Sequence, residues 1–389
     1  MDIYSEYLIT KKKYLDMKKN QVGGFKDCKI EDNDTILSVS HFFNSIVLKT
    51  HDDKIYKILL STTYKNKSND DEIKNEINIL KILKKNIIDS GLSNHIIKIK
   101  KVKKCNNINK IFSKCETSFI EYIKKNNNIT YSNLFINDKN IGSVSETIRS
   151  SKNNLLSFLE NLKINNKNKI CEEKYEYHPH KKYSENYKII ELEYCNLSAH
   201  DFIVEISKLT ESLLIEYLNI FLFQILYTLL QCKKIYPNFV HGDLHLENIL
   251  GYREQNNNNF YTYLNNDNIY YVPAKIFFPK INDFGLSTIN GNINDVKYYD
   301  LYTILINIFD LLMVLFKNNL HKLKICYEYF NTFFDTHIIL NTNNTNINNI
   351  SDPEYQQYIS IQDPEYLMDT YFYNIFGKHN KNIATFGKN

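Results

Sequence analysis

Tryptophan is absent from this chain of 389 residues, and glycine and proline are scarce, with 10 and 6 residues respectively. Asparagine, isoleucine, lysine and tyrosine are abundant instead, a bias that is typical of an AT-rich coding sequence. Enrichment in asparagine or lysine is therefore not, by itself, evidence for a binding surface. The formal net charge of +4 is small for this length, and it favours neither a nucleic-acid-binding surface nor a polybasic membrane anchor.

A paired cysteine motif is also missing. The seven cysteines are scattered, with no Cys-x-x-Cys pair and no compact Cys/His cluster, which favours reduced thiols in a cytosol-like compartment. The first residues lack the basic and apolar regions of a secretory signal. The most apolar stretches, 213–230 and 301–316, carry Glu216 and Asp310, as buried helices do and membrane spans rarely do. We expect a soluble, cytoplasmic monomer with no membrane span.

Two motifs in a fixed order carry the chemistry. In Phe239–Leu250 (FVHGDLHLENIL), Asp243 and Asn248 lie five residues apart between short β-prone apolar runs. A turn with this spacing can present a carboxylate to a substrate hydroxyl and an amide oxygen to Mg²⁺. In Lys280–Ser287 (KINDFGLS), Asp283 precedes Phe-Gly after another strand-like run. Either match alone could arise by chance, whereas the ordered pair indicates a phosphotransferase.

The region before these motifs has the pattern of a small antiparallel sheet followed by a helix. The runs with a strand pattern are 36–39, 45–49 and 55–60. Lys57 lies inside the third run, and Glu76 lies on a helix that the acidic residues 70–72 can cap. Each charge alone is as simply explained as a solvated surface residue. The order of lysine strand, glutamate helix and the two motifs is what indicates a functional role.

The remaining chain divides coarsely by composition. Residues 1–34 have no clear period, and the polar residues 104–185 are interpreted as an insertion that is partly helical around 155–162 and partly disordered. The other expected elements are a strand at 187–195, a buried helix at 213–232, an elaborated hairpin between 250 and 280, and an apolar helix that ends near 316. Beyond about 341 the sequence is rich in asparagine and tyrosine.

The lysine strand, the glutamate helix and the two motifs resemble those of the eukaryotic-like protein kinase superfamily. The resemblance covers roughly 36–316, with the insertion excluded. Among the members of this superfamily, the haspin-like atypical kinases and the kinase-like proteins of large DNA viruses have a similar catalytic loop and long inserts. The resemblance implies an α+β, bilobal fold with a small β-rich N-lobe at 35–192 and a larger, mostly helical C-lobe at 193–340. Residues 1–34 and 341–389 would be terminal extensions. A viral origin would place the protein in the host cytoplasm or the virion.

The resemblance also carries roles to individual residues. It implies ATP and Mg²⁺ as cofactors, with Asp243 as catalytic base, Asn248 and Asp283 as Mg²⁺ ligands, and Asp300 as a buried acid that braces the catalytic loop. Lys57 would hold the ATP phosphates and pair with Glu76. Further nucleotide contacts fall on Ser38 and Ser40 in the phosphate loop, on Leu192 as gatekeeper, and on Glu193 and Cys195 in the hinge.

Four departures from the family pattern qualify this expectation. Serines stand where the phosphate loop has glycines, so close backbone approach to the phosphates is harder. Gly242 replaces an arginine, and His245 replaces a lysine in the catalytic loop, where it would supply a full charge only when protonated. Only 17 positions separate Asp283 from Asp300, with no Ala-Pro-Glu motif between them. The substrate-docking segment is therefore abbreviated.

Three classes of function remain open. The hinge residues 192–195 and the helix residues 75–80 resemble those of protein kinases. They favour a Ser/Thr protein kinase that acts on a protein substrate. The short docking segment and the His-Gly-Asp-Leu-His string favour a small-molecule kinase of the aminoglycoside or choline kinase type. The serine-containing phosphate loop favours a pseudokinase scaffold, although the filled catalytic positions oppose it.

Overall fold

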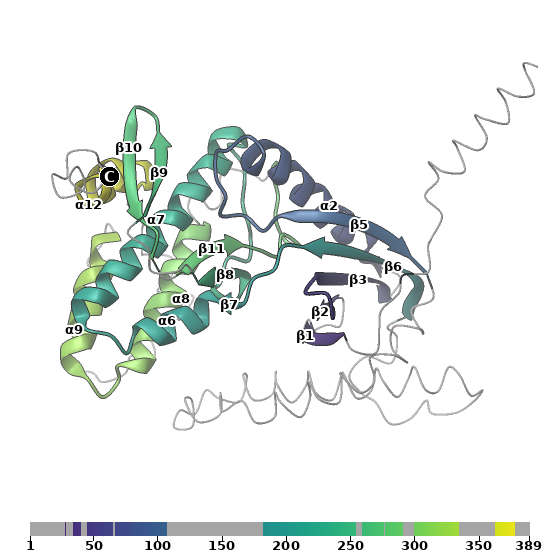
Figure 1. The fold of residues 1–389 in the computed structure, drawn as a ribbon, viewed down its shortest axis with the longest axis horizontal. Helices are drawn as coiled ribbons and strands as arrows, with labels where there is room; N and C mark the ends of the chain where they lie inside the picture. Colours follow the sequence, from purple (N-terminus) through teal and green to yellow (C-terminus); the bar gives the residue numbers. More distant parts are fainter. Residues whose placement is uncertain are drawn as a thin grey trace, which may run out of the picture. The chain divides into compact units, whose positions relative to one another are not determined.

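The computed structural model of the chain describes residue 28 and residues 34–39, 45–64, 67–106, 182–253, 259–275, 277–290, 299–333 and 362–377. Its α+β fold has two compact units (Figure 1). The described residues of Met1–Lys74 and Ile99–Tyr194 form the first unit, and those of Asn75–Lys98 and Cys195–Asn389 form the second. The predicted helix at 155–162, like most of residues 1–34 and of the insertion, lies outside the described residues. The predicted lobe boundaries stay a prediction.

The first unit is built on an antiparallel sheet with the strand order β1-β2-β3-β6-β5, and a short strand β4 pairs with β3. The strands are β1 (Thr35–Val39), β2 (Ser45–Lys49), β3 (Ile55–Tyr64), β4 (Lys67–Ser68), β5 (Ile99–Cys105) and β6 (Lys182–Leu192). In β2, Ile46 and Leu48 are buried while their neighbours are partly exposed, which is the alternation that a sheet with one covered face requires. The three strands predicted from the sequence are confirmed.

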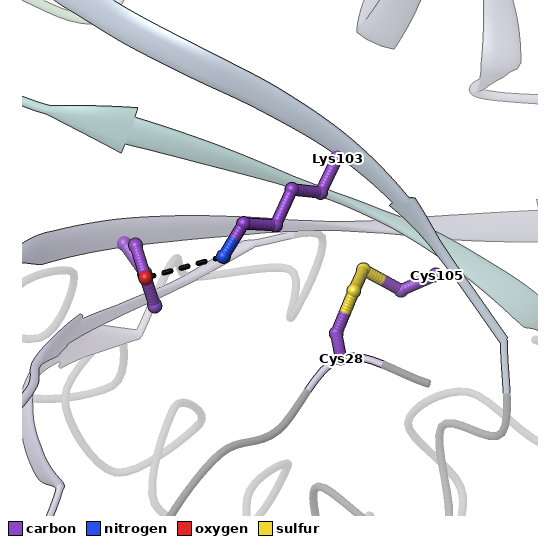
Figure 2. Close-up of a disulfide and its surroundings, with 4 residues drawn as sticks. Cys28, Lys103 and Cys105 are labelled. Atoms are coloured by element: carbon purple, nitrogen blue, oxygen red, sulfur yellow. Dashed lines mark hydrogen bonds between the residues drawn. A yellow bond between two sulfur atoms is a disulfide. The ribbon is translucent and has the colours of Figure 1, made fainter. Parts of the chain in front are cut away.

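A disulfide joins Cys28 to Cys105 at the end of β5, across 77 residues of sequence (Figure 2). The expectation that all the cysteines are reduced is wrong for this pair. No local spacing could reveal the bond, because folding brings the two Cα atoms to 5.6 Å. The ammonium of Lys103, which is labelled in the same view, lies 4.8 Å from the centre of the Tyr56 ring and donates to the Tyr56 hydroxyl at 3.2 Å. Both contacts stay within the first unit.

The predicted acidic start and apolar spacing of the helix after β4 are confirmed in α2 (Asp70–Leu83). The buried residues Ile73, Ile77, Leu80 and Leu83 recur at helical spacing along it. The helix continues into a π-helical turn, η1 (Lys84–Ile88). From Asn75 onward this segment belongs to the second unit. There the Ser93 hydroxyl hydrogen-bonds to that of Thr228 at 2.9 Å in a buried position.

The second unit is mostly helical. Its main helices are α6 (Ala199–Ile206), α7 (Glu211–Ile235), α8 (Tyr299–Leu315) and α9 (Leu320–Phe330), with 3₁₀ turns η2 (Leu246–Asn248) and η3 (Asn331–Phe333). Among the described residues, α7 alone has the length and apolar composition of a membrane span. However, 83% of its most apolar 18-residue window is buried inside the protein, as in the core helix that the sequence predicted.

Two small sheets accompany these helices. One has the order β11-β8-β7, formed by β7 (Leu197–Ser198), β8 (Ile249–Arg253) and β11 (Phe277–Ile281). The other is the hairpin of β9 (Phe260–Asn265) and β10 (Asn268–Pro273), which matches the elaborated hairpin expected between 250 and 280. The hairpin lies beside α12 in Figure 1.

Part of the predicted C-terminal extension belongs to the second unit and forms α11 (Pro364–Leu367), η5 (Met368–Phe372) and α12 (Tyr373–Phe376). The rings of Phe372 and Phe376 lie 5.6 and 5.3 Å from that of Phe223 in α7. The Tyr270 hydroxyl donates to the Met368 carbonyl at 3.2 Å. Asp363 caps α11 by accepting from the amide of Glu365 at 2.8 Å. The Asp-Pro-Glu-Tyr string at 363–366 therefore has a structural role as a helix start.

Candidate active site

The register of β8 and β11 brings the two sequence motifs together. Ile249 opens β8 directly after Asn248, and it lies opposite Ile281, which ends β11 directly before Asn282 and Asp283. Because the strands are antiparallel, the end of the loop that carries Asp243 and Asn248 meets the start of the Asp-Phe-Gly motif. The amide of Asn282 donates to the Asn248 carbonyl at 2.8 Å. The two predicted Mg²⁺ ligands, Asn248 and Asp283, are therefore held on adjacent backbone segments.

Hydrogen bonds from two buried side chains, Asp300 and His241, hold the loop 241–248 in place. One carboxylate oxygen of Asp300 accepts from the amide of His241 at 2.7 Å, and the other accepts from the amide of Gly242 at 3.0 Å. The His241 Nε2 donates to the Asn282 carbonyl at 2.9 Å, and its Nδ1 accepts from the Asp243 amide at 3.3 Å. Burial lowers the pKa of His241, although Asp300 opposes that shift. The predicted bracing role of Asp300 is confirmed.

Asp243 and Asn248 are bonded to each other. The Asn248 side-chain nitrogen donates to the Asp243 carbonyl at 2.8 Å and to its carboxylate at 3.1 Å. This commits the nitrogen of the amide, so its oxygen is the atom suited to bind a cation. The Asp243 side chain is 46% exposed, which leaves the carboxylate accessible to an acceptor hydroxyl.

His245 faces the same carboxylate at a longer distance. Its Nδ1 accepts from the Glu247 amide at 3.3 Å, so the neutral ring carries its proton on Nε2. That Nε2 lies 3.7 Å from the Asp243 carboxylate, beyond hydrogen-bonding range. The ring is 36% exposed, and it can therefore turn toward a bound group near Asp243.

Backbone conformations that L-residues rarely adopt occur on both sides of the site. Asp283 has a φ of +60° and is followed by the fully buried Phe284, whose ring lies 4.9 Å from that of His241. Gly242 has a φ of +82°, and a Cβ there would lie 2.7 Å from the Leu286 carbonyl oxygen. Glycine at 242 is thus required by the close approach of residue 286. The glycine at this position, where the resemblance leads one to expect an arginine, therefore has a structural reason.

The remaining predicted site residues are distributed over both units. Lys57 is 5% exposed on β3 between Val47 and Ile190, and Leu192 is 3% exposed at the end of β6. Ser38 is an exposed residue of β1, and Glu193 follows β6. These four belong to the first unit, whereas Glu76, which is 5% exposed, and Cys195 belong to the second. The pairing of Lys57 with Glu76 stays a prediction, and Ser40 lies outside the described residues.

Sequence reasoning missed a contact between α2 and the segment after Asp283. The Asn75 side chain donates to the Ser287 carbonyl at 2.9 Å, within the second unit. Asn75 directly precedes Glu76 in the sequence. However, in a chain so rich in asparagine, a single asparagine does not indicate a contact with a distant segment.

The donor chemistry at the site fits Mg²⁺. No group of three or more His, Cys, Asp or Glu side chains suited to a metal occurs among the residues that the structure describes. Mg²⁺ needs fewer protein ligands, because it prefers oxygen donors and takes several from phosphates and water. The carboxylate of Asp283 and the amide oxygen of Asn248, freed for this by the bonds of its nitrogen to Asp243, meet that requirement.

Comparison with known proteins finds similarity over a short part of the chain. No family model matches the chain. A protein of Acanthamoeba polyphaga mimivirus described as a "Putative serine/threonine-protein kinase" is 39% identical over 85 residues, which is 21% of this chain and 21% of that protein. The chain thus matches about a fifth of the length of this relative.

Proposed function

We propose that the protein is an ATP- and Mg²⁺-dependent phosphotransferase, and that it is a Ser/Thr protein kinase. The observation that carries the proposal is the arrangement of Asp243, Asn248 and Asp283, joined through the Asn282 amide and braced by Asp300. In this proposal the first unit corresponds to the β-rich lobe of a kinase, and the second to its helical lobe. The partial likeness to the mimivirus protein supports the same reaction class.

The residues would divide the chemistry as phosphoryl transfer requires. Asn248 and Asp283 would hold Mg²⁺, which supplies charge that offsets the phosphate oxygens when it is bound. Lys57 would contribute a second positive charge to the phosphates. Asp243 would orient the acceptor hydroxyl and accept its proton, which its exposed carboxylate allows. The His241 and Asp300 bonds keep the loop in place, so that little reorganisation is needed during the reaction.

His245 adds a hydrogen-bond donor beside the base. Its Nε2–H points to the side of the loop that carries the Asp243 carboxylate, and a ring rotation would let it donate to a phosphate oxygen instead. A neutral imidazole supplies one hydrogen bond there, while a protonated one supplies a full charge.

A small-molecule acceptor is the second candidate. The observation in its favour is the short stretch between Asp283 and Asp300, which leaves few residues to dock a polypeptide. The same loop chemistry serves a protein hydroxyl and a small alcohol equally well. The acceptor therefore has to be assigned by assay.

The test is incubation of the protein with γ-labelled ATP and Mg²⁺, scored separately for autophosphorylation, protein acceptors and a panel of amino-alcohol acceptors. We expect labelled protein, and we expect Asp283→Asn to lower the rate by at least about a hundredfold, because a neutral amide cannot replace the metal-binding charge. Asp71→Asn is the matched control, since the Asp71 side chain is 95% exposed on α2. Equal rates for the two variants would overturn the assignment, and label only in the small-molecule panel would select the second candidate.

A further inference from the structure

Asn75 fastens helix α2 to the segment that follows Asp283. Its side-chain nitrogen donates to the carbonyl of Ser287 at 2.9 Å, although 212 residues separate the two in sequence. Asn75 directly precedes Glu76, and Ser287 lies four residues after Asp283. The bond therefore ties the part of the helix that carries Glu76 to the segment that carries the metal-binding acid.

Ser287 is held in turn by the catalytic loop. Its hydroxyl donates to the His241 carbonyl at 2.8 Å, and the residue is 2% exposed. The next residue, Thr288, exchanges two backbone hydrogen bonds of 2.9 Å with Val240. A continuous path of hydrogen bonds thus runs from Asn75 through Ser287 to His241, the residue whose own amide is bound by Asp300.

We infer that Asn75 is a positioning residue that keeps Glu76 in register with the catalytic loop. This inference rests on the proposed function. Asn75 is an exposed residue, so the loss of its single hydrogen bond has little effect on the core of the second unit. It does remove the side-chain bond that ties this part of α2 to residue 287. The expected result of its loss is a folded protein in which α2 more often leaves its working position.

Asn75→Asp tests the inference, because it keeps the shape of the side chain and removes the donor. Asn78→Asp is the matched control, since Asn78 is an exposed asparagine three residues further along the same helix and gains the same charge. We expect kcat/KM for ATP to fall about fivefold to tenfold in Asn75→Asp, the effect of one lost hydrogen bond. We expect less than a twofold change in Asn78→Asp, and equal thermal midpoints for both.

Two further measurements separate positioning from a merely structural role. In the double variant Asn75→Asp/Ser287→Ala the losses should not multiply, because the first substitution already breaks the path. Amide hydrogen exchange over residues 284–290 should be faster in Asn75→Asp than in Asn78→Asp. This exchange measurement does not depend on activity.

The outcomes distinguish this inference from the proposed function. An active wild-type protein in which both asparagine variants share the same rate and the same exchange would overturn the inference and leave the proposed function standing. Faster exchange without a loss of rate would also overturn it, because the bond would then be structural only. A wild-type protein with no phosphate transfer would refute the proposed function, and unchanged exchange in Asn75→Asp would then remove the link as well.

Discussion

Acid should destabilise the second unit through His95, whose ring is fully buried. The ring nitrogen Nδ1 donates to the Pro279 carbonyl at 2.9 Å, which can only accept, so Nε2 accepts from the Tyr263 hydroxyl at 2.7 Å. The ring also stacks on that of Phe278 at 4.2 Å. Protonation would place a charge in this apolar site and would leave the Tyr263 proton without its acceptor. Both effects oppose the charged imidazole.

The magnitude follows from the pKa. Burial lowers the pKa of His95 to about 3, from an ordinary value of 6.5. Since the unfolded chain binds the proton and the folded chain does not, stability is fully present above pH 6.5 and is lost as pH falls toward 3. Between pH 7.5 and pH 5 the loss amounts to about 2 kcal/mol, and the full loss would approach about 5 kcal/mol. That is a large share of the typical stability of about 5–15 kcal/mol.

The assay is urea unfolding at pH 7.5, 6.5, 5.5 and 5.0, followed by far-ultraviolet circular dichroism because the chain has no tryptophan. His95→Gln is compared with the wild type at each pH, so that acid effects of other groups cancel. We expect the variant to be less stable at pH 7.5 and to recover about 2 kcal/mol relative to the wild type by pH 5. A pH-independent difference between them, or an imidazole that titrates near 6.5 by NMR, would refute the reasoning.

Four further predictions concern other parts of the chain. Burial raises the pKa of Asp310 to about 6 from 3.8, so the protein loses stability as pH rises through this range and the carboxyl ionises. Asp310→Asn should therefore stabilise the protein by about 2–3 kcal/mol at pH 7.5 and not at pH 3.5, as measured by thermal unfolding. Gly242→Ala should lower kcat/KM at least about tenfold, because the added Cβ would clash with the Leu286 carbonyl. Gly91→Ala is the control: its φ is +76°, but the space around it is open, so kcat/KM should change less than twofold. Equal losses in the two variants would contradict the close-approach argument. Reduction of the Cys28–Cys105 bond, which spans 77 residues, should destabilise the first unit by up to about 4–5 kcal/mol. Cys28→Ser should make the unfolding of this unit insensitive to dithiothreitol. An unfolding midpoint of the wild type that does not change on reduction would contradict this prediction. Phosphatase treatment should leave the initial rate within about twofold, because no arginine precedes Asp243 to pair with a phosphate and Ser287 is buried; a hundredfold loss would show that the segment is regulated by phosphorylation.

The parts of the fold that could be predicted from the sequence depend on short-range patterns. Strand alternation identified β1, β2 and the first part of β3, and apolar spacing identified α2, α7 and α8. Asp243 and Asn248 were grouped by their five-residue spacing, and in the structure they bond to each other directly. Asp300 was assigned only by resemblance, and its two bonds to the loop confirm it.

Features that depend on distant partners could not be predicted. Nothing local marks Cys28 and Cys105 as a pair, or Asn75 as a partner of Ser287. The lysine run at 100–104 lies on β5, an edge strand of the described sheet, and three of its four lysines are exposed. Lysines are common on such edges because they discourage pairing with another chain, so composition alone gives the exposure without the strand.

The C-terminal helices were missed for a related reason. The stretch beyond 341 is so rich in asparagine that its composition does not indicate a helix. The helix cap at Asp363 and the buried aromatic residues after it could therefore not be recognised from the sequence. The rings of Phe372 and Phe376 pack against that of Phe223 in α7, which lies more than 140 residues earlier in the chain. Helices as short as α11 and α12 are formed by such tertiary packing rather than by their own propensity.

The most direct test of the central claim is a comparison of wild-type protein and Asp243→Asn in initial-rate transfer from γ-labelled ATP, with Mg²⁺-dependent ATP binding measured on the same samples. Asp243 is assigned to the acceptor hydroxyl and not to the nucleotide, so the account predicts equal ATP affinity and a transfer rate that is lower by at least about a hundredfold in the variant. Transfer at the wild-type rate by Asp243→Asn, with ATP bound, would contradict the account.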